Sequence, residues 1–136
     1  MFKDILLEQA KLSEIELTDL QVEQLTRYYE LLIEWNEKMN LTALTEPVDV
    51  ALKHFCDSIL LLKYADIPID SSLIDVGTGA GFPSLPIKIV RPDIKLCLLD
   101  SLNKRLTFLA EVVKELKLNN VQIVHSRAED GSRKAE

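Results

Sequence analysis

Residues 73–83 read Leu-Ile-Asp-Val-Gly-Thr-Gly-Ala-Gly-Phe-Pro, and this stretch decides the fold. Residues 73–76 predict a short strand, which runs directly into three glycines at alternate positions. The apolar residues from Leu85 to Val90 then predict a helix that ends before Pro92. In this arrangement backbone N–H groups and a helix N-terminus surround a ligand, and glycines leave its approach clear. The stretch therefore predicts a ligand-binding turn between a strand and a helix.

The alternation of strand and helix continues after this turn. Residues 95–100 predict a second strand, residues 103–116 a second helix and residues 121–125 a third strand. Short apolar strands that alternate with helices are typical of a parallel sheet. We therefore expect an α/β fold of the Rossmann-like class, with residues 67–136 forming the N-terminal half of an α/β domain with about three parallel strands.

The first 66 residues predict a helical extension. A short helix over residues 5–12 is followed by a long one over residues 19–38, and Thr18-x-x-Gln21 has the form of a capping box. A third helix is expected from Pro47 to Tyr64. The spacing of apolar residues in the long helix predicts one buried stripe, which consists of Leu20, Leu25, Tyr28, Leu32, Trp35 and Met39.

Composition narrows the class of protein. The chain has 136 residues, is 47% hydrophobic and carries a net charge of −6. We expect a soluble, cytoplasmic protein, because no apolar run approaches the roughly 20 residues that span a bilayer. Cys56 and Cys97 are expected to be buried, reduced thiols that form neither a metal site nor a disulfide. The acidic balance leaves RNA contact to a local patch, for which the candidate cations are Lys53, Lys88, Arg91, Lys104 and Arg105. The last three are alternatively solvated charges at helix ends.

Three classes of cofactor are candidates for the glycine turn. Nucleoside triphosphates are disfavoured because no Gly-Lys-Ser/Thr follows, and dinucleotides are disfavoured because the sixth position of their fingerprint is Phe82. S-adenosylmethionine has no pyrophosphate and tolerates the alternating spacing, with Asp75 two residues ahead. Asp100 ends the second strand, where a carboxylate can accept hydrogen bonds from ribose hydroxyls. Alternatively, the glycines form a tight turn and Asp100 caps the next helix at Leu102.

Four groups of residues resemble one family. They are Glu-Trp-Asn at 34–36 with Asn-Leu-Thr at 40–42; His-Phe-Cys-Asp-Ser at 54–58; the turn and its flanks at 75–86; and Leu-Asp-Ser at 99–101 with Lys-Arg at 104–105 and Arg-Ala-Glu at 127–129. In this order they resemble the bacterial glucose-inhibited division protein B family, whose members methylate N7 of a guanosine in small-subunit (16S) ribosomal RNA. The resemblance thus implies an S-adenosylmethionine-dependent methyltransferase.

The resemblance also implies roles for single residues. It places cofactor contacts at Gly77, Phe82, Asp100, Ala128 and Glu129. These join Asp75, Gly79 and Gly81 of the turn, although an acid such as Glu129 is alternatively only solvated.

On the substrate side of the cofactor, the resemblance implies roles for Asn36, Asn40, His54 and Asp57. Asn40 alternatively caps the preceding helix. His54 and Asp57, three residues apart, alternatively bond to each other.

No catalytic dyad is expected, because N7 of guanine carries a free lone pair and its attack on a methyl group needs positioning more than a base. Family members continue well past a third strand, so we expect a fragment that methylates poorly alone and has a sheet edge open to self-association. A non-catalytic S-adenosylmethionine- or RNA-binding module and, less favoured, a nicotinamide-dependent oxidoreductase remain alternatives.

Overall fold

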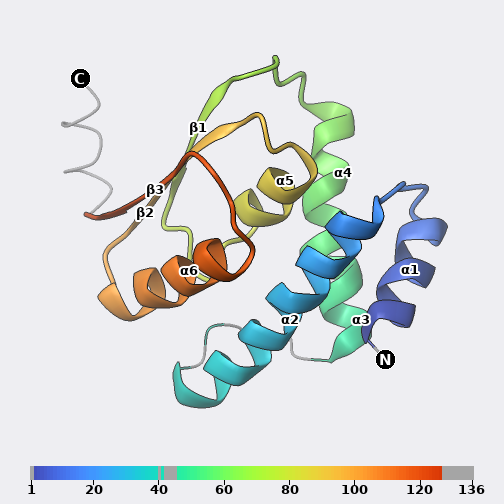
Figure 1. Ribbon diagram of the computed structural model, residues 1–136, viewed down its shortest axis with the longest axis horizontal. Coiled ribbons are helices and arrows are strands. Elements are labelled where there is room, and N and C mark those ends of the chain that lie inside the picture. The colour runs from blue at the N-terminus through green and yellow to red at the C-terminus, as the bar shows by residue number, and fades with distance from the viewer. Residues whose placement is uncertain (1, 40, 42–45, 127–136) are drawn as a thin grey trace.

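The computed structural model describes residues 2–39, 41 and 46–126, and it confirms the α/β fold (Figure 1). A three-stranded sheet lies on one side of the molecule. Helices α5 (Ser84–Val90) and α6 (Asn103–Glu115) cover one of its faces, and the N-terminal helices pack against these two from the far side. The sheet, the two covering helices and the N-terminal helices therefore form successive layers.

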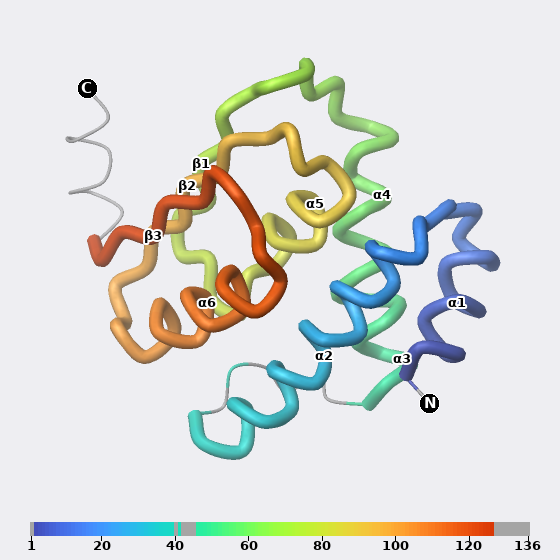
Figure 2. The backbone as a smooth tube through the Cα atoms, viewed as in Figure 1, coloured from blue at the N-terminus to red at the C-terminus, as the bar shows by residue number. Residues whose placement is uncertain are grey.

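The sheet is parallel throughout, in the order β1 (Ser72–Val76), β2 (Lys95–Asp100), β3 (Val121–His125). Helix α5 connects β1 to β2, and α6 connects β2 to β3 (Figure 2). The strand boundaries agree with the sequence prediction to within one residue. Because the strands are parallel, their carboxyl ends meet at one edge, where β1 passes into the glycine turn.

The N-terminal layer begins with α1 (Phe2–Leu12) and α2 (Asp19–Met39). The predicted capping box is confirmed. The N–H of Thr18 donates to Oε1 of Gln21 over 2.9 Å, and the N–H of Gln21 donates to Oγ1 of Thr18 over 3.1 Å. This reciprocal pair satisfies donors that a helix start leaves without intrahelical partners.

The predicted stripe on α2 is confirmed at its centre, only in part at Trp35 and Met39, which are half-buried against the core, and not at its first member. Leu25, Tyr28 and Leu32 are fully buried, whereas Leu20 is 63% exposed. Leu20 precedes Leu25 by five residues, which places it roughly 140° around the helix from that side chain. Val22 takes its place in the core because it lies three residues before Leu25.

The third predicted helix is present but is not α-helical throughout. It consists of α3 (Pro47–Asp49), a π-helical segment η1 (Val50–Cys56) and α4 (Asp57–Tyr64). The π-helical segment was not predicted, because the apolar spacing alone does not distinguish it from an α-helix. Such segments are rare in proteins overall, but those that occur are often found at functional sites.

The buried side chains form one cluster that joins the N-terminal helices to the α/β half. Leu25 and Phe55 belong to it together with Leu98 and Phe108. The division of the chain at residue 66 therefore stays a prediction, since the two parts share a core. In the described part of the chain, no helix is long and apolar enough to cross a membrane.

The two cysteines differ in their burial. Cys56 is buried as expected, and burial raises the pKa of its thiol to about 11. Cys97 is only half-buried, contrary to expectation, because its side chain lies on the sheet face that no described helix covers. The structure includes both as free thiols.

Candidate functional site

The glycine turn occupies residues 77–83, at the carboxyl edge of the sheet between β1 and α5. Gly77, Gly79 and Gly81 all have positive φ angles, of 70°, 58° and 96°. Residues with a Cβ atom are strained at such φ angles, whereas glycine is not. The path of the turn therefore explains why glycine stands at these three positions. Ligands of open α/β sheets bind outside this edge of the strands.

The N–H groups of the three glycines are used inside the protein. Gly77 donates to the carbonyl of Leu99 over 2.8 Å, and Gly81 donates to that of Thr78 over 2.9 Å. Gly79 donates to Oδ2 of Asp100 over 3.0 Å. The N–H groups of these three glycines therefore donate within the protein, and the expectation that backbone N–H groups of the turn surround a ligand stays a prediction.

The space around the glycines divides them into two kinds. A Cβ atom added to Gly77 or Gly79 would meet nothing within 4 Å. A Cβ atom added to Gly81 would lie 2.6 Å from the hydroxyl of Tyr28 and 2.6 Å from Cδ1 of Leu85. The first two glycines thus border open space, whereas the third is packed against the protein.

Asp100 ends β2 and is only 2% exposed. Besides the bond from Gly79, it accepts one over 3.0 Å at Oδ1 from the N–H of Leu102, which precedes α6. A guanidinium nitrogen of Arg105 lies 3.6 Å from the same oxygen. The structure thus gives Asp100 the capping role that the sequence left as an alternative. The predicted contact with ribose hydroxyls is not tested and stays a prediction.

Two polar atoms at the turn are buried without a hydrogen-bond partner among the described residues. They are Oδ2 of Asp75 and Oγ1 of Thr78. Buried polar atoms nearly always have a partner, so each unpaired one needs an explanation. Both atoms belong to residues that flank Gly77 in the sequence, and neither is open to solvent in this structure.

Phe82 closes the turn with an aromatic surface. The ring of His54, from η1, stacks on it with centroids 4.1 Å apart and an interplanar angle of 2°. Burial lowers the pKa of His54, and the charge of Asp49 opposes this shift. The structure therefore brings Phe82 and His54 together, although 28 residues separate them in the sequence.

Two of the other predicted substrate-side residues lie on helices of the N-terminal layer, and their predicted roles stay predictions. Asp57 is exposed at the start of α4. Asn36 is half-buried on α2, eight residues after Tyr28 and thus about 12 Å along the helix axis from it. Asn40, Ala128 and Glu129 fall outside the described residues, so their predicted roles stay predictions.

Two of the five cations named as candidate RNA contacts, Lys88 and Arg91, are bound within the protein. Lys88 is buried, and its ammonium donates to the carbonyls of Pro92 and Ile94. Arg91 binds Asp93 through two nitrogens, at 2.8 and 2.9 Å. Lys88 is thus wrong as an RNA contact, because its charge faces the protein interior.

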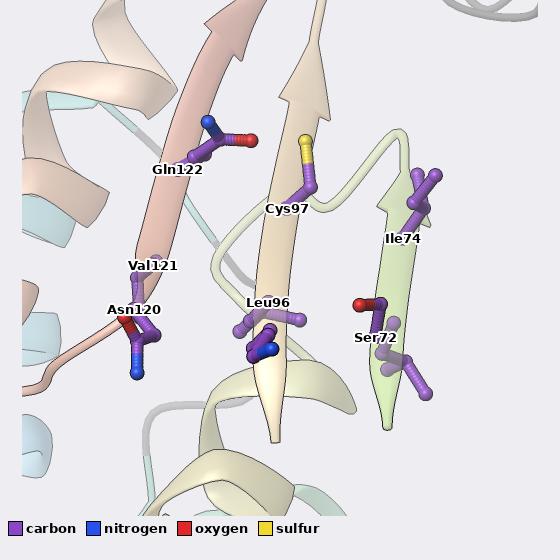
Figure 3. A pocket seen from close by; sticks show the side chains of 9 residues that line it. Ser72, Ile74, Leu96, Cys97, Asn120, Val121 and Gln122 are labelled. Carbon is purple, nitrogen blue, oxygen red and sulfur yellow. The ribbon is translucent and has the colours of Figure 1, made fainter. Parts of the chain in front are cut away.

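A hollow of the described surface lies elsewhere, on the uncovered sheet face. It has a volume of about 520 Å³ and is lined by residues of all three strands. Figure 3 shows three of its lining residues, Ile74, Cys97 and Gln122, abreast on neighbouring strands. The hollow lies over the amino-terminal half of the strands, which is the wrong end for a ligand of a parallel α/β sheet. We assign it to the uncovered face and not to the functional site.

Tyr28 is the one residue at the turn that sequence reasoning placed only in the core. Its hydroxyl donates a hydrogen bond of 2.5 Å to the carbonyl of Ala80, in the centre of the turn. The signal in the sequence was a tyrosine among the apolar residues of the stripe, since a buried tyrosine hydroxyl usually finds a partner.

Comparison with known proteins gives the family. Residues 21–136 match the family described as rRNA small subunit methyltransferase G (GidB). The chain belongs to this family. The match includes α2, the π-helical segment, the glycine turn and β3, and thus every residue of the candidate site.

Individual relatives agree with the family assignment. A ribosomal RNA small subunit methyltransferase G of Desulforamulus reducens is 55% identical over 127 residues, which are 93% of this chain and 53% of the relative. The relative of the same description in Alkaliphilus oremlandii is 54% identical over 94% of this chain and 54% of its own length. One from Lactococcus lactis is 54% identical over 86% of this chain and 50% of its own length. The chain thus spans about half the length of these relatives.

Proposed function

We propose that the glycine turn binds S-adenosylmethionine and that the whole protein transfers its methyl group to N7 of a guanosine in small-subunit ribosomal RNA. The observation that carries the proposal is the open space beside Gly77 and Gly79 at the carboxyl edge of the sheet, in a turn where two buried oxygens, those of Asp75 and Thr78, have no partner among the described residues. The names of the relatives support the reaction and the substrate class.

The residues of the turn fit this cofactor. The carboxylate of Asp75 and the hydroxyl of Thr78 would accept hydrogen bonds from its ammonium group. Gly77 and Gly79 leave room for its approach, and Phe82 offers an apolar wall. Of the two oxygens of Asp100, each already accepts an N–H of the protein, so a ribose would share them through their second lone pairs. Ala128 and Glu129 remain part of the proposal.

When bound, the cofactor supplies an electrophilic methyl group on a sulfonium. The lone pair of guanine N7 needs no proton removed, so this chain need not provide a general base. Its task is to hold the two reactants in line, which alone can contribute about 7–11 kcal/mol to rate enhancement. The stacked pair of His54 and Phe82 borders the turn, where a flat base would find an aromatic surface. We place Asn36, Asn40 and Asp57 farther out, toward the RNA.

Two measurements test the proposal. Calorimetric titration of the 136-residue chain with S-adenosylmethionine should show binding, and Gly77→Val should weaken it, because the new side chain enters the open space. A full-length protein that contains this chain should transfer methyl label to under-methylated small subunits. Binding without transfer by that protein would leave a binding module and reject the enzyme. Binding of NADH in preference to S-adenosylmethionine would reject the cofactor.

A further inference from the structure

Tyr28 connects the N-terminal helices to the glycine turn across 52 residues of sequence. It lies in the middle of α2 and is fully buried. Its ring stacks between those of Phe55 and Phe82, with centroids 5.3 and 5.5 Å away. This aromatic packing holds the ring in place through contacts that a phenylalanine would also make.

The hydroxyl of Tyr28 has a separate role. Burial is the main cause that raises the pKa of this group, and the charge of Asp75 adds to the shift, so the hydroxyl stays a neutral donor. It donates to the carbonyl of Ala80 and lies 2.6 Å from the point where a Cβ of residue 81 would be. A buried hydroxyl costs free energy relative to an apolar group unless it makes such a bond.

This bond fixes one peptide group of the turn from both ends. The carbonyl of Ala80 accepts from Tyr28, and the N–H of the same peptide, which belongs to Gly81, donates to the carbonyl of Thr78. Rotation of this peptide would break both bonds. The backbone of Thr78 and Gly79, next to the open space, is held by the same constraint.

We propose that Tyr28 is a positioning residue, which holds the glycine turn in the conformation that binds S-adenosylmethionine. The inference rests on the proposed function and extends it. The N-terminal helix α2 then belongs to the cofactor site, although it contributes no contact with the cofactor. The hydroxyl, and not the ring, carries this role.

The test compares the wild-type chain with Tyr28→Phe and Tyr29→Phe, each of which removes one hydroxyl from α2. Tyr29 is a matched control because its ring stacks on Phe2 of α1, away from the turn. Titration with S-adenosylmethionine well below the unfolding midpoint should show about tenfold weaker binding for Tyr28→Phe, the worth of one buried hydrogen bond. Tyr29→Phe should bind as the wild type does. A merely structural Tyr28 would lower the unfolding midpoint and leave the affinity of the folded chain unchanged, which would overturn the inference.

Amide hydrogen exchange separates this inference from the proposed function. The Gly81 amide should exchange faster in Tyr28→Phe than in the wild type, with no cofactor present. If the wild type fails to bind S-adenosylmethionine, the proposed function falls, and the cofactor role of Tyr28 falls with it. Unchanged Gly81 exchange would reject the constraint itself.

A measurement on the wild type covers the case in which the variant does not fold. Cofactor binding should then slow amide exchange around Tyr28 on α2, and unchanged exchange there would overturn the coupling.

Discussion

The two sides of the glycine turn differ more than its regular spacing suggests. On one side, Gly77 and Gly79 border open space, and two polar oxygens, those of Asp75 and Thr78, are buried without partners among the described residues. On the other side, Gly81 touches Tyr28 and Leu85 so closely that no Cβ fits. The three glycines thus share a backbone conformation and differ in their surroundings: the first two border open space, where we propose that a ligand binds, and the third is packed against the protein.

This difference teaches how the turn is stabilised. Its outer side is free to accept a ligand because its inner side is held by an aromatic layer and by Asp100. A binding loop needs such support, since the residues that hold a site in place determine its geometry. The predictions below each change one side of the turn, or one face of the sheet beneath it, and compare the result with the other.

The largest effect is expected from Gly81→Ala. Its methyl group would overlap two buried side chains in a backbone region that alanine already disfavours, so we expect a loss of about 3 kcal/mol or more in the free energy of unfolding. Gly77→Ala, with the same strain and no overlap, should lose only about 1–2 kcal/mol. Urea unfolding followed by the fluorescence of Trp35 measures both. Equal losses would contradict the division of the turn.

A smaller effect is expected from Asp100→Asn. The asparagine keeps the shape of the side chain but replaces one accepting oxygen with an NH₂ group, which cannot accept from Gly79 or Leu102. We expect a loss of about 1–3 kcal/mol, the cost of an unsatisfied buried group. Asp93→Asn is a suitable control, because that carboxylate binds Arg91 just before the start of β2, at the opposite end of the strand from the turn. A loss no larger than that of the control would reject the role of Asp100 beneath the turn.

The pH dependence of stability sharpens the role of His54. Burial lowers its pKa in the folded state, so the unfolded chain binds this proton more readily. Stability should therefore be complete above the unfolded pKa of about 6.5 and should fall as the pH decreases through that value. His54→Phe should remove this dependence between about pH 7.5 and 5.5 and keep the stack on Phe82. The control His125→Gln should retain it, and a profile unchanged by His54→Phe would contradict the assignment.

The smallest effect on stability is expected on the uncovered face of the sheet. Ile74 is 56% exposed, so Ile74→Thr should change the free energy of unfolding by no more than about 0.5 kcal/mol. Leu98, on the covered face, is fully buried, and Leu98→Ala should cost about 2–5 kcal/mol.

We also expect the chain to self-associate through its open sheet. Ile74→Thr should weaken this self-association, as measured by sedimentation velocity. A large loss of stability in Ile74→Thr would show that the face is covered in solution.

The helices and strands could be predicted from local sequence, whereas the contacts between them could be predicted only in part. Strands β2 and β3 and the capping box of α2 agree with the prediction because alternation, turn residues and caps act over a few residues. The exposed Leu20 and the π-helical segment were missed, because the partners that orient a helix lie far away in the sequence.

The candidate site shows the same limit. The spacing of Gly77 and Gly79 predicted a turn at these residues. The contact of Gly81 with Tyr28, in contrast, joins two layers of the fold and leaves no local signal in the sequence. The stack of His54 on Phe82 was likewise found only in three dimensions.

The central claim is that S-adenosylmethionine occupies the open side of the turn. Titration of the ¹⁵N-labelled chain with this cofactor, followed by amide chemical shifts, tests it most directly. We predict that the largest changes fall on Gly77, Thr78 and Gly79 and extend to Asp100. Changes confined to the uncovered sheet face around Ile74 and Cys97, or no changes at saturating cofactor, would contradict it.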